Sequence, residues 1–85
     1  MVSFEYTVTD PVGIHARPAG ALVRIAAAAP CEVTIAGKGK DVSMKKLFAL
    51  MSLGIKGGDE VKVTCTGEGE EETLSKIEDF FRANL

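Results

Sequence analysis

The chain opens on a regular alternation of apolar and polar residues. The apolar positions of this segment are Val2, Phe4, Tyr6 and Val8. Polar residues fill the positions between and after them, as far as Thr9. Successive side chains of a β-strand point to opposite faces, so this period of two predicts a half-buried strand.

The same period returns later in the chain. Val33 and Ile35 alternate with polar residues, and so do the apolar residues of segment 61–66. Both segments are therefore predicted to be strands. Between them, Gly37-Lys38-Gly39 is a turn signal, and residues 40–42 can return as a short strand of a hairpin.

Apolar residues recur at helical spacing in the remaining segments. This spacing predicts helices over about 16–28, 43–53 and 70–84, each with an apolar stripe along one side. Proline is tolerated only in the first turn of a helix, so Pro18 fixes the first helix start close to His15. The element order is therefore β-α-β-β-α-β-α, which favours an α+β fold with an antiparallel sheet that has one solvent-exposed face.

Length and composition set limits on the function. With 85 residues, the chain has room for a single domain, 1–85. A net charge of −2 argues against nucleic acid as a partner. No segment resembles a membrane span or a secretory signal, and Cys31 and Cys65 lack the short spacing of metal ligands. We therefore expect a cytoplasmic protein with no bound metal, no cofactor and no membrane contact.

The candidate chemistry centres on His15, the only histidine, which stands between a glycine-containing loop and a predicted helix start. A lone histidine there is most often a surface loop residue or a helix cap. However, the N–H groups of an opening helical turn have no intrahelical partners and form a favourable site for phosphate. Arg17 lies in the same turn, and its guanidinium can bind phosphate oxygens in a forked geometry. These features predict a phosphohistidine site at His15, with Ala16 and Arg17 binding the phosphate.

The segment Gly13-Ile14-His15-Ala16-Arg17-Pro18-Ala19 resembles the active-site signature of the HPr family, the histidine-containing phosphocarriers of the bacterial sugar phosphotransferase system. Gly39-Lys40, Leu47, Leu50 and Met51-Ser52-Leu53-Gly54-Ile55 also match the family pattern, as do the length and the element order. The resemblance covers the whole chain. It implies an open-faced β-sandwich, a four-stranded antiparallel sheet with three helices on one face.

The same resemblance implies a function and its partners. His15 would accept a phosphoryl group from phosphorylated enzyme I and pass it to the IIA domains of sugar transporters. The protein would then be a monomeric carrier in a transfer chain rather than a stand-alone catalyst. Two positions depart from the family pattern: Lys46 stands where some relatives carry a regulatory serine, and Val12 replaces a small polar residue. The first departure puts serine-kinase regulation in doubt.

The second predicted helix carries more apolar residues than a short helix can bury, so some must be exposed. The resemblance implies that partners bind there, beside the histidine. Arg24 and its lysine neighbours could add positive charge to this surface, although single charges are usually just solvated. The residues expected to bind partners are Ala16, Gly20, Arg24, Leu47, Phe48 and Met51.

Two other classes of function compete with the carrier. One is a regulatory adaptor on the same fold that binds a transcription factor, such as one of catabolite control, or a kinase; retention of His15 argues against that as the sole role. The other is a small nucleic-acid or metal-binding module. It is disfavoured because the chain lacks a basic surface, stacking aromatics on its central strands and a Cys-x-x-Cys pair.

Overall fold

The computed structural model describes residues 1–85. Its elements follow the expected order β-α-β-β-α-β-α. The strands are β1 (Val2–Thr7), β2 (Glu32–Gly37), β3 (Lys40–Ser43) and β4 (Glu60–Thr66). The helices are α1 (Ala16–Ala28), α2 (Leu47–Met51) and α3 (Glu70–Asn84).

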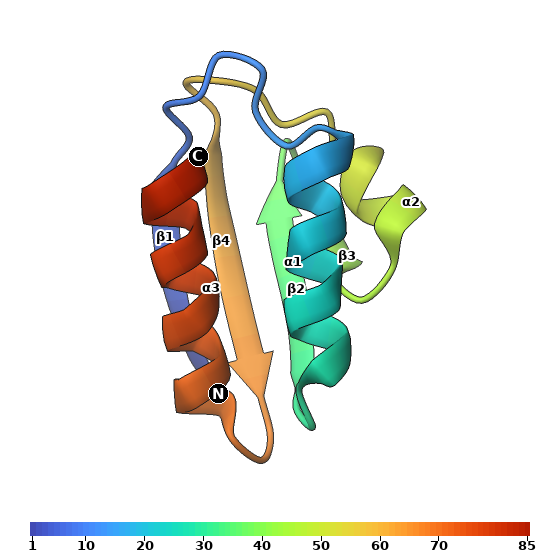
Figure 1. Cartoon of the computed structure of the whole chain (residues 1–85), viewed down its shortest axis with the longest axis vertical. Coiled ribbons are helices and arrows are strands. Elements are labelled where there is room, and N and C mark those ends of the chain that lie inside the picture. Colours follow the sequence, from blue (N-terminus) through green and yellow to red (C-terminus); the bar gives the residue numbers. More distant parts are fainter.

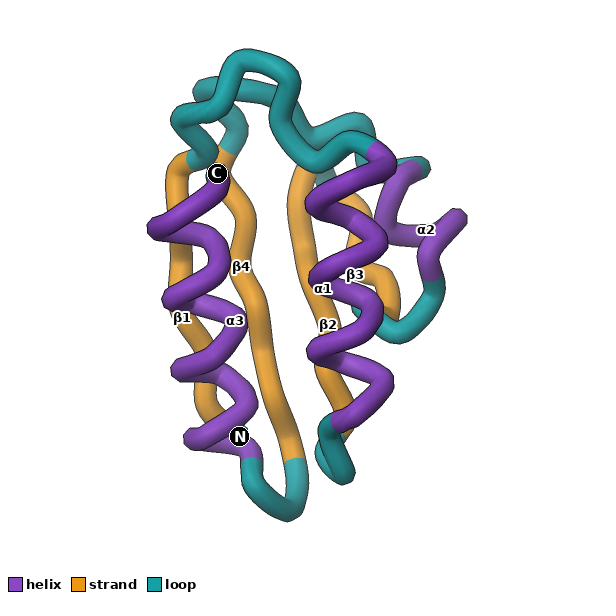
Figure 2. The backbone as a smooth tube through the Cα atoms, viewed as in Figure 1, coloured by secondary structure: helices purple, strands orange, loops and turns teal.

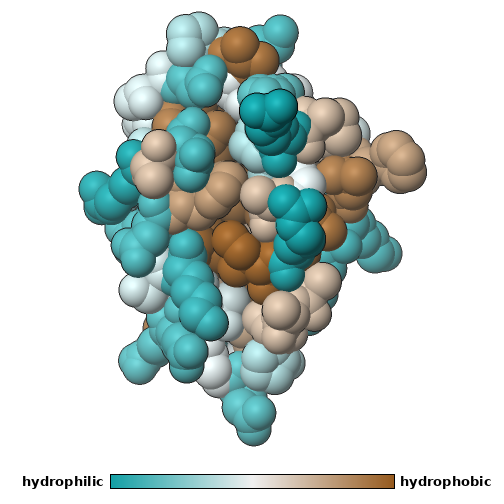
Figure 3. Space-filling model, in the orientation of Figure 1, coloured by the Kyte–Doolittle hydropathy of each residue, from teal (hydrophilic) through white to brown (hydrophobic).

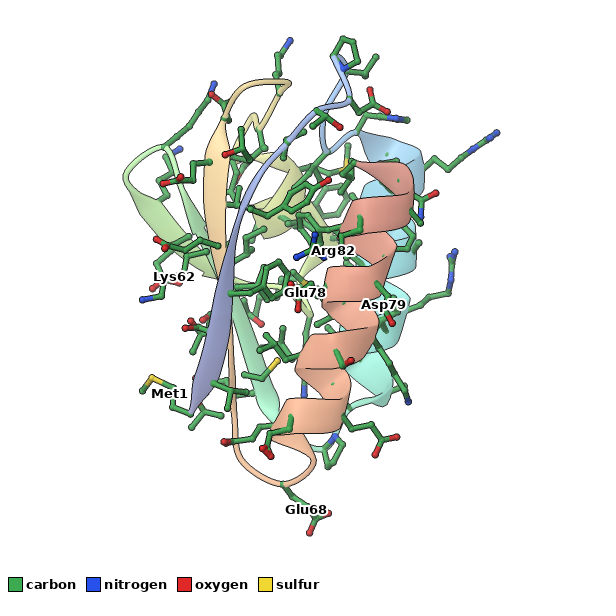
Figure 4. The ribbon with its side chains drawn as sticks, turned by 90° about the vertical axis from the view of Figure 1, so that its left-hand side faces the viewer. Met1, Lys62, Glu68, Glu78, Asp79 and Arg82 are labelled. Carbon is green, nitrogen blue, oxygen red and sulfur yellow. The ribbon has the colours of Figure 1, made fainter.

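The strands form one antiparallel sheet in the order β1-β4-β2-β3. Helices α1 and α3 run side by side over one face of this sheet, and α2 lies beside α1 near β3 (Figure 1). The other face carries no helix, as the tube view also shows (Figure 2). Lys62 of β4 extends from that open face, on the far side of the sheet from α3 (Figure 4). The predicted open-faced sandwich is therefore confirmed.

The alternation of the strands sets the core between the sheet and the helices. Val61, Val63 and Cys65 of β4 are buried on the helix-covered side. Phe81 of α3 packs edge-on against two aromatic rings of β1, with ring centroids 5.6 Å from Phe4 and 5.5 Å from Tyr6. Such edge-to-face contacts add to the stabilisation that apolar burial provides.

Both cysteines lie in this core as free thiols, as small apolar residues would. Burial, followed by the neighbouring Cys31 thiol, raises the pKa of Cys65 to about 11. Cys65 therefore stays protonated at neutral pH and belongs to the packing. None of the helices is both long and apolar enough to cross a membrane.

The second helix is shorter than the sequence predicts. Segment 43–53 was expected to be helical, whereas α2 spans Leu47–Met51. Ser43 instead completes β3 opposite Thr34, and the Met44 N–H extends the ladder by donating to the Val33 carbonyl at 2.9 Å. Sheet pairing and full burial of Met44 thus override its helical spacing to Leu47 and Phe48.

Candidate functional site

His15 is the N-cap residue of α1, with an extended backbone (φ −102°, ψ −172°). Its carbonyl oxygen accepts the first helical hydrogen bond, from the Ala19 N–H at 2.9 Å. Its own N–H donates to the Gly13 carbonyl at 3.1 Å. The imidazole makes no capping hydrogen bond, and the residue is exposed to solution.

The opening turn of α1 leaves two backbone donors without a partner. Four N–H groups at a helix start lack intrahelical acceptors. Here the His15 N–H is bound to the loop, and Pro18 has no N–H. The N–H groups of Ala16 and Arg17 donate to no acceptor in the chain, and no acidic residue lies in this turn. The turn therefore presents an anion-binding pair of donors directly beside the imidazole.

A pocket of about 340 Å³ opens next to this turn. Arg17 lines the pocket, and so does Arg24, which lies two turns further along the same helix. The Arg24 side chain passes over Gly20, where a Cβ would lie 3.8 Å from Arg24 Nη1, an ordinary contact distance. The complete lining consists of Asp10, His15, Arg17, Pro18, Ala21, Arg24, Phe80 and Asn84.

The loop that carries His15 is fixed against the segment that follows α2. Gly13 has φ +73°, and any Cβ there would clash with the Ile55 carbonyl oxygen, so the position requires glycine. That same oxygen accepts the Ile14 N–H at 3.0 Å. The supporting turn is held by Asp59, whose carboxylate accepts the Lys56 N–H at 2.9 Å. This hydrogen bond is the main cause that keeps the pKa of Asp59 below its ordinary value.

Asp10 is one of the residues of the site that sequence reasoning missed. Its Oδ1 accepts the Val12 N–H at 2.9 Å, and its main-chain carbonyl accepts the Gly13 N–H at 3.0 Å. An aspartate followed by proline is typical of a turn whose side chain binds the backbone two residues on. That local signal was available in the sequence. Phe80 and Asn84 of α3 had no such signal, because only tertiary packing brings them to the pocket.

The apolar residues of α2 divide as the short helix requires. Leu50 is fully buried, whereas Phe48 is 85% exposed and Leu47 and Met51 are each 37% exposed. We call these three exposed residues the α2 patch. In the space-filling view, hydrophobic atoms gather at the right-hand edge, where α2 lies (Figure 3). The α2 patch does not line the His15 pocket, but α2 packs directly against α1.

The remaining predicted surface residues lie on α1 and just before α2. Ala16 and Arg24 are exposed, and Gly20 is half-buried. Lys46 is the N-cap of α2 and is exposed. Lys45 donates from Nζ to the Ala29 carbonyl at 3.2 Å, which places a positive charge at the C-terminal end of α1. The last turn of α1 itself contains no basic residue.

Comparison with known proteins gives consistent results. The family model described as the phosphorylation site of the HPr component of the phosphotransferase system (PTS) matches residues 2–83. Phosphocarrier protein HPr of Mycoplasma genitalium is 40% identical over 78 residues, which cover 91% of this chain and 89% of that protein.

Solved structures agree with this match. HPr-C-His from Thermoanaerobacter tengcongensis has a TM-score of 0.92 at 29% identity, over 98% of this chain and 93% of that one. Crh of Bacillus subtilis, described as a dimer with a swapped domain, has a TM-score of 0.77 at 33% identity, over 100% of this chain and 98% of that one. Family match, sequence identity and shared fold thus extend over nearly the whole length. This chain belongs to the HPr family, the phosphocarrier proteins of the phosphotransferase system.

Proposed function

We propose that this protein accepts a phosphoryl group on His15 from phosphorylated enzyme I and donates it to the IIA domains of sugar transporters. The observation that supports this most is the pair of unpartnered N–H groups at Ala16 and Arg17, directly beside an exposed, uncapped imidazole. Nucleophile and anion site thus share one helical turn. A carrier that hands its group on needs both, and it needs no substrate cleft of its own.

The proposed step is a displacement at phosphorus. A lone pair of one His15 ring nitrogen, Nδ1 by family resemblance, forms a bond to phosphorus, while the bond to the donor atom of enzyme I breaks and its electron pair returns to that atom. The N–H groups of Ala16 and Arg17 and the Arg17 guanidinium bind the phosphoryl oxygens, where negative charge gathers. In the transfer to a IIA domain, a nucleophilic atom of that domain forms the new bond to phosphorus, while the bond to the His15 nitrogen breaks and its electron pair returns to the ring.

Partner proteins are proposed to dock on the α2 patch and on the neighbouring face of α1 that carries Ala16, Gly20 and Arg24. Phe48 is the centre of this surface because it is the most exposed large apolar side chain of the chain. An exposed apolar group of this size is typical of an interface. Arg24 adds a positive charge suited to acidic side chains of a partner.

Incubation with phosphoenolpyruvate and enzyme I tests the proposal. Intact mass measurement should show the gain of one phosphoryl group, labile in acid and stable in base, as expected of a phosphoramidate. The variant His15→Ala should gain none, and a later addition of IIA domains should remove the group from the wild-type protein. Phosphorylation that survives in His15→Ala would contradict the assignment.

A regulatory adaptor that binds a transcription factor of catabolite control is the second candidate. The similarity to Crh favours it, because that protein is described as a catabolite repression protein. The two functions separate in one experiment. An adaptor would bind its partner through the α2 patch even as His15→Ala, whereas a carrier loses its activity in that variant.

We further propose that the protein acts in the cytoplasm as a monomer. Helix α1 and its pocket are complete within one chain, so the phosphoryl site needs no second copy. The swapped dimer described for Crh is the alternative. Sedimentation equilibrium over a wide concentration range decides between them.

A further inference from the structure

The loop that leads into His15 is held at three points by one residue, Asp10. Its carboxylate accepts the Val12 N–H at 2.9 Å, its carbonyl accepts the Gly13 N–H at 3.0 Å, and its N–H donates to the Leu85 carbonyl at 2.9 Å. One residue therefore joins the loop to the end of α3 and also closes the turn just before the histidine. A short side chain that binds the backbone two residues on is a known means of fixing such a turn.

The neighbouring Val12 cannot replace this function. Its side chain is 59% exposed and has no polar atom, so it cannot make a hydrogen bond that would stabilise the turn. The Val12 N–H has the Asp10 carboxylate as its only acceptor in the chain. Asp10 therefore supplies the side-chain hydrogen bond of this loop, beside the main-chain bond from the Ile14 N–H to the Ile55 carbonyl, and helps to set the direction in which His15 leaves the loop.

Asp10 also brings negative charge to the phosphoryl site. Asp10 lines the same pocket as His15, Arg17 and Arg24. Asp10 takes part in none of the ion pairs of the chain, which are formed by Glu70, Asp59, Glu72 and Glu78. A phosphoryl group on His15 carries a charge of about −2, so this carboxylate repels it across the pocket.

We propose that Asp10 is a positioning residue for phosphoryl transfer, which holds the His15 loop by its hydrogen bond and lowers the stability of the phosphorylated form by its charge. This inference rests on the proposed carrier function. The two arginines attract the group and Asp10 repels it, so the phosphoryl group is held loosely enough to be passed on. A carrier benefits from such a balance, because a group bound too tightly would not leave for the next protein.

The variant Asp10→Asn separates charge from hydrogen bonding, because its amide oxygen can still accept the Val12 N–H. In equilibrium with enzyme I and its phosphorylated form, Asp10→Asn should shift the ratio of phosphorylated to free protein upward about fivefold. The matched control is Asp41→Asn, which makes the same charge change on exposed strand β3, outside this pocket. An equal ratio in both variants would overturn the role of the charge.

The variant Asp10→Ala removes the acceptor as well. Hydrogen exchange of the Val12 amide should quicken about tenfold in Asp10→Ala and stay near the wild-type rate in Asp10→Asn. Transfer from enzyme I should be about tenfold slower in Asp10→Ala than in Asp10→Asn. Equal exchange and equal transfer rates in the two variants would overturn the positioning role.

A titration with inorganic phosphate keeps this inference separate from the carrier function. Followed by the amide signals of Ala16 and Arg17, phosphate should bind about threefold more tightly to Asp10→Asn than to Asp41→Asn. If the wild-type protein accepts no phosphoryl group from enzyme I, the carrier proposal fails, yet this titration and the Val12 exchange still decide the role of Asp10. Equal phosphate affinities would count against the charge.

Discussion

Helices α1 and α3 lie side by side on the same sheet, yet their N-termini are finished in opposite ways. The first turn of α3 holds Glu70, Glu71 and Glu72. Glu70 Oε1 accepts the Gly67 N–H at 2.9 Å, and the carboxylate also pairs with the N-terminal ammonium at 2.9 Å. The first turn of α1 contains no acidic residue. Both helix starts leave N–H groups without an acceptor, those of Ala16 and Arg17 in α1 and those of Glu71 and Glu72 in α3, so the two ends differ in charge.

The difference shows how the same backbone feature serves two purposes. The partial positive charge at a helix start favours a nearby anion. In α3 the chain supplies that anion itself, and the helix gains stability. In α1 the first turn has no acidic side chain, so an anion that is not part of the chain can bind there. The first turn of α1 thus lacks the stabilisation that acidic residues give α3, and under the proposed function the phosphoryl group on His15 would take their place.

The largest effect is expected when an acidic residue is introduced into the first turn of α1. In Ala16→Glu, a carboxylate at an exposed position of the first turn should occupy the donors that phosphate needs. Phosphoryl transfer from enzyme I should fall by about 100-fold or more, while stability changes by no more than about 1 kcal/mol. Quench-flow transfer assays and urea unfolding measure the two effects. The control Ala27→Glu, at the exposed far end of α1, should transfer at the wild-type rate; an active Ala16→Glu would refute the comparison.

Removal of the cation beside the free N–H groups should have the next largest effect. Arg17→Ala leaves both donors in place but deletes the guanidinium that neutralises the phosphoryl charge. The transfer rate should drop by about 10- to 100-fold, while docking to enzyme I, measured by calorimetry, stays close to wild type. Arg82→Ala, which removes an exposed arginine of α3, serves as the charge-matched control. A loss of docking equal to the loss of rate would assign Arg17 to binding instead.

If α1 performs the chemistry, the α2 patch should affect binding alone. Phe48→Glu places a charge on a side chain that is 85% exposed, so the protein should fold normally by circular dichroism. Its affinity for enzyme I should fall by about tenfold, with little change in the transfer step at saturation. Leu47→Glu should act in the same direction. If both variants fold and bind with wild-type affinity, docking involves another surface, with Gly20 and Arg24 of α1 as the first to test.

The smallest effect is expected at α3. The Gly67 N–H, followed by the N-terminal ammonium, holds the pKa of Glu70 below its ordinary value of 4.5. Glu70 therefore contributes stability that is fully present above that value and is lost as the pH falls through the lower pKa of the folded state. Wild type should be slightly more stable than Glu70→Gln at neutral pH, and the difference should vanish in acid. Urea unfolding across this range checks it, and a difference independent of pH would exclude the charge.

Sequence patterns predicted α1 well because two independent signals coincide there. In α1 the apolar stripe is bounded by Pro18 and Pro30, and the helix spans 16–28 as expected. In α2 only the spacing was available. Met44 fits that spacing, but its N–H pairs with the Val33 carbonyl, and a local period cannot report a bond across the sheet.

The residues of the site were likewise predictable only where a local pattern marks them. Ala16 and Arg17 follow from a proline that fixes a helix start beside a histidine, which is a local argument. Asp10 had a local signal that was overlooked. Phe80 and Asn84 reach the His15 pocket because α3 packs beside α1, and no pattern within either helix encodes that arrangement.

The Leu85 carbonyl oxygen accepts hydrogen bonds from the main-chain N–H of both Thr9 and Asp10, and Leu85 is itself buried. Asp10 and Asn84 line the His15 pocket, so anything joined to the chain after Leu85 would begin beside that pocket. Met1 lies at the opposite end of the molecule (Figure 1). Affinity tags, fluorophores and surface tethers for this protein consequently belong at the N-terminus, where they leave the transfer face clear.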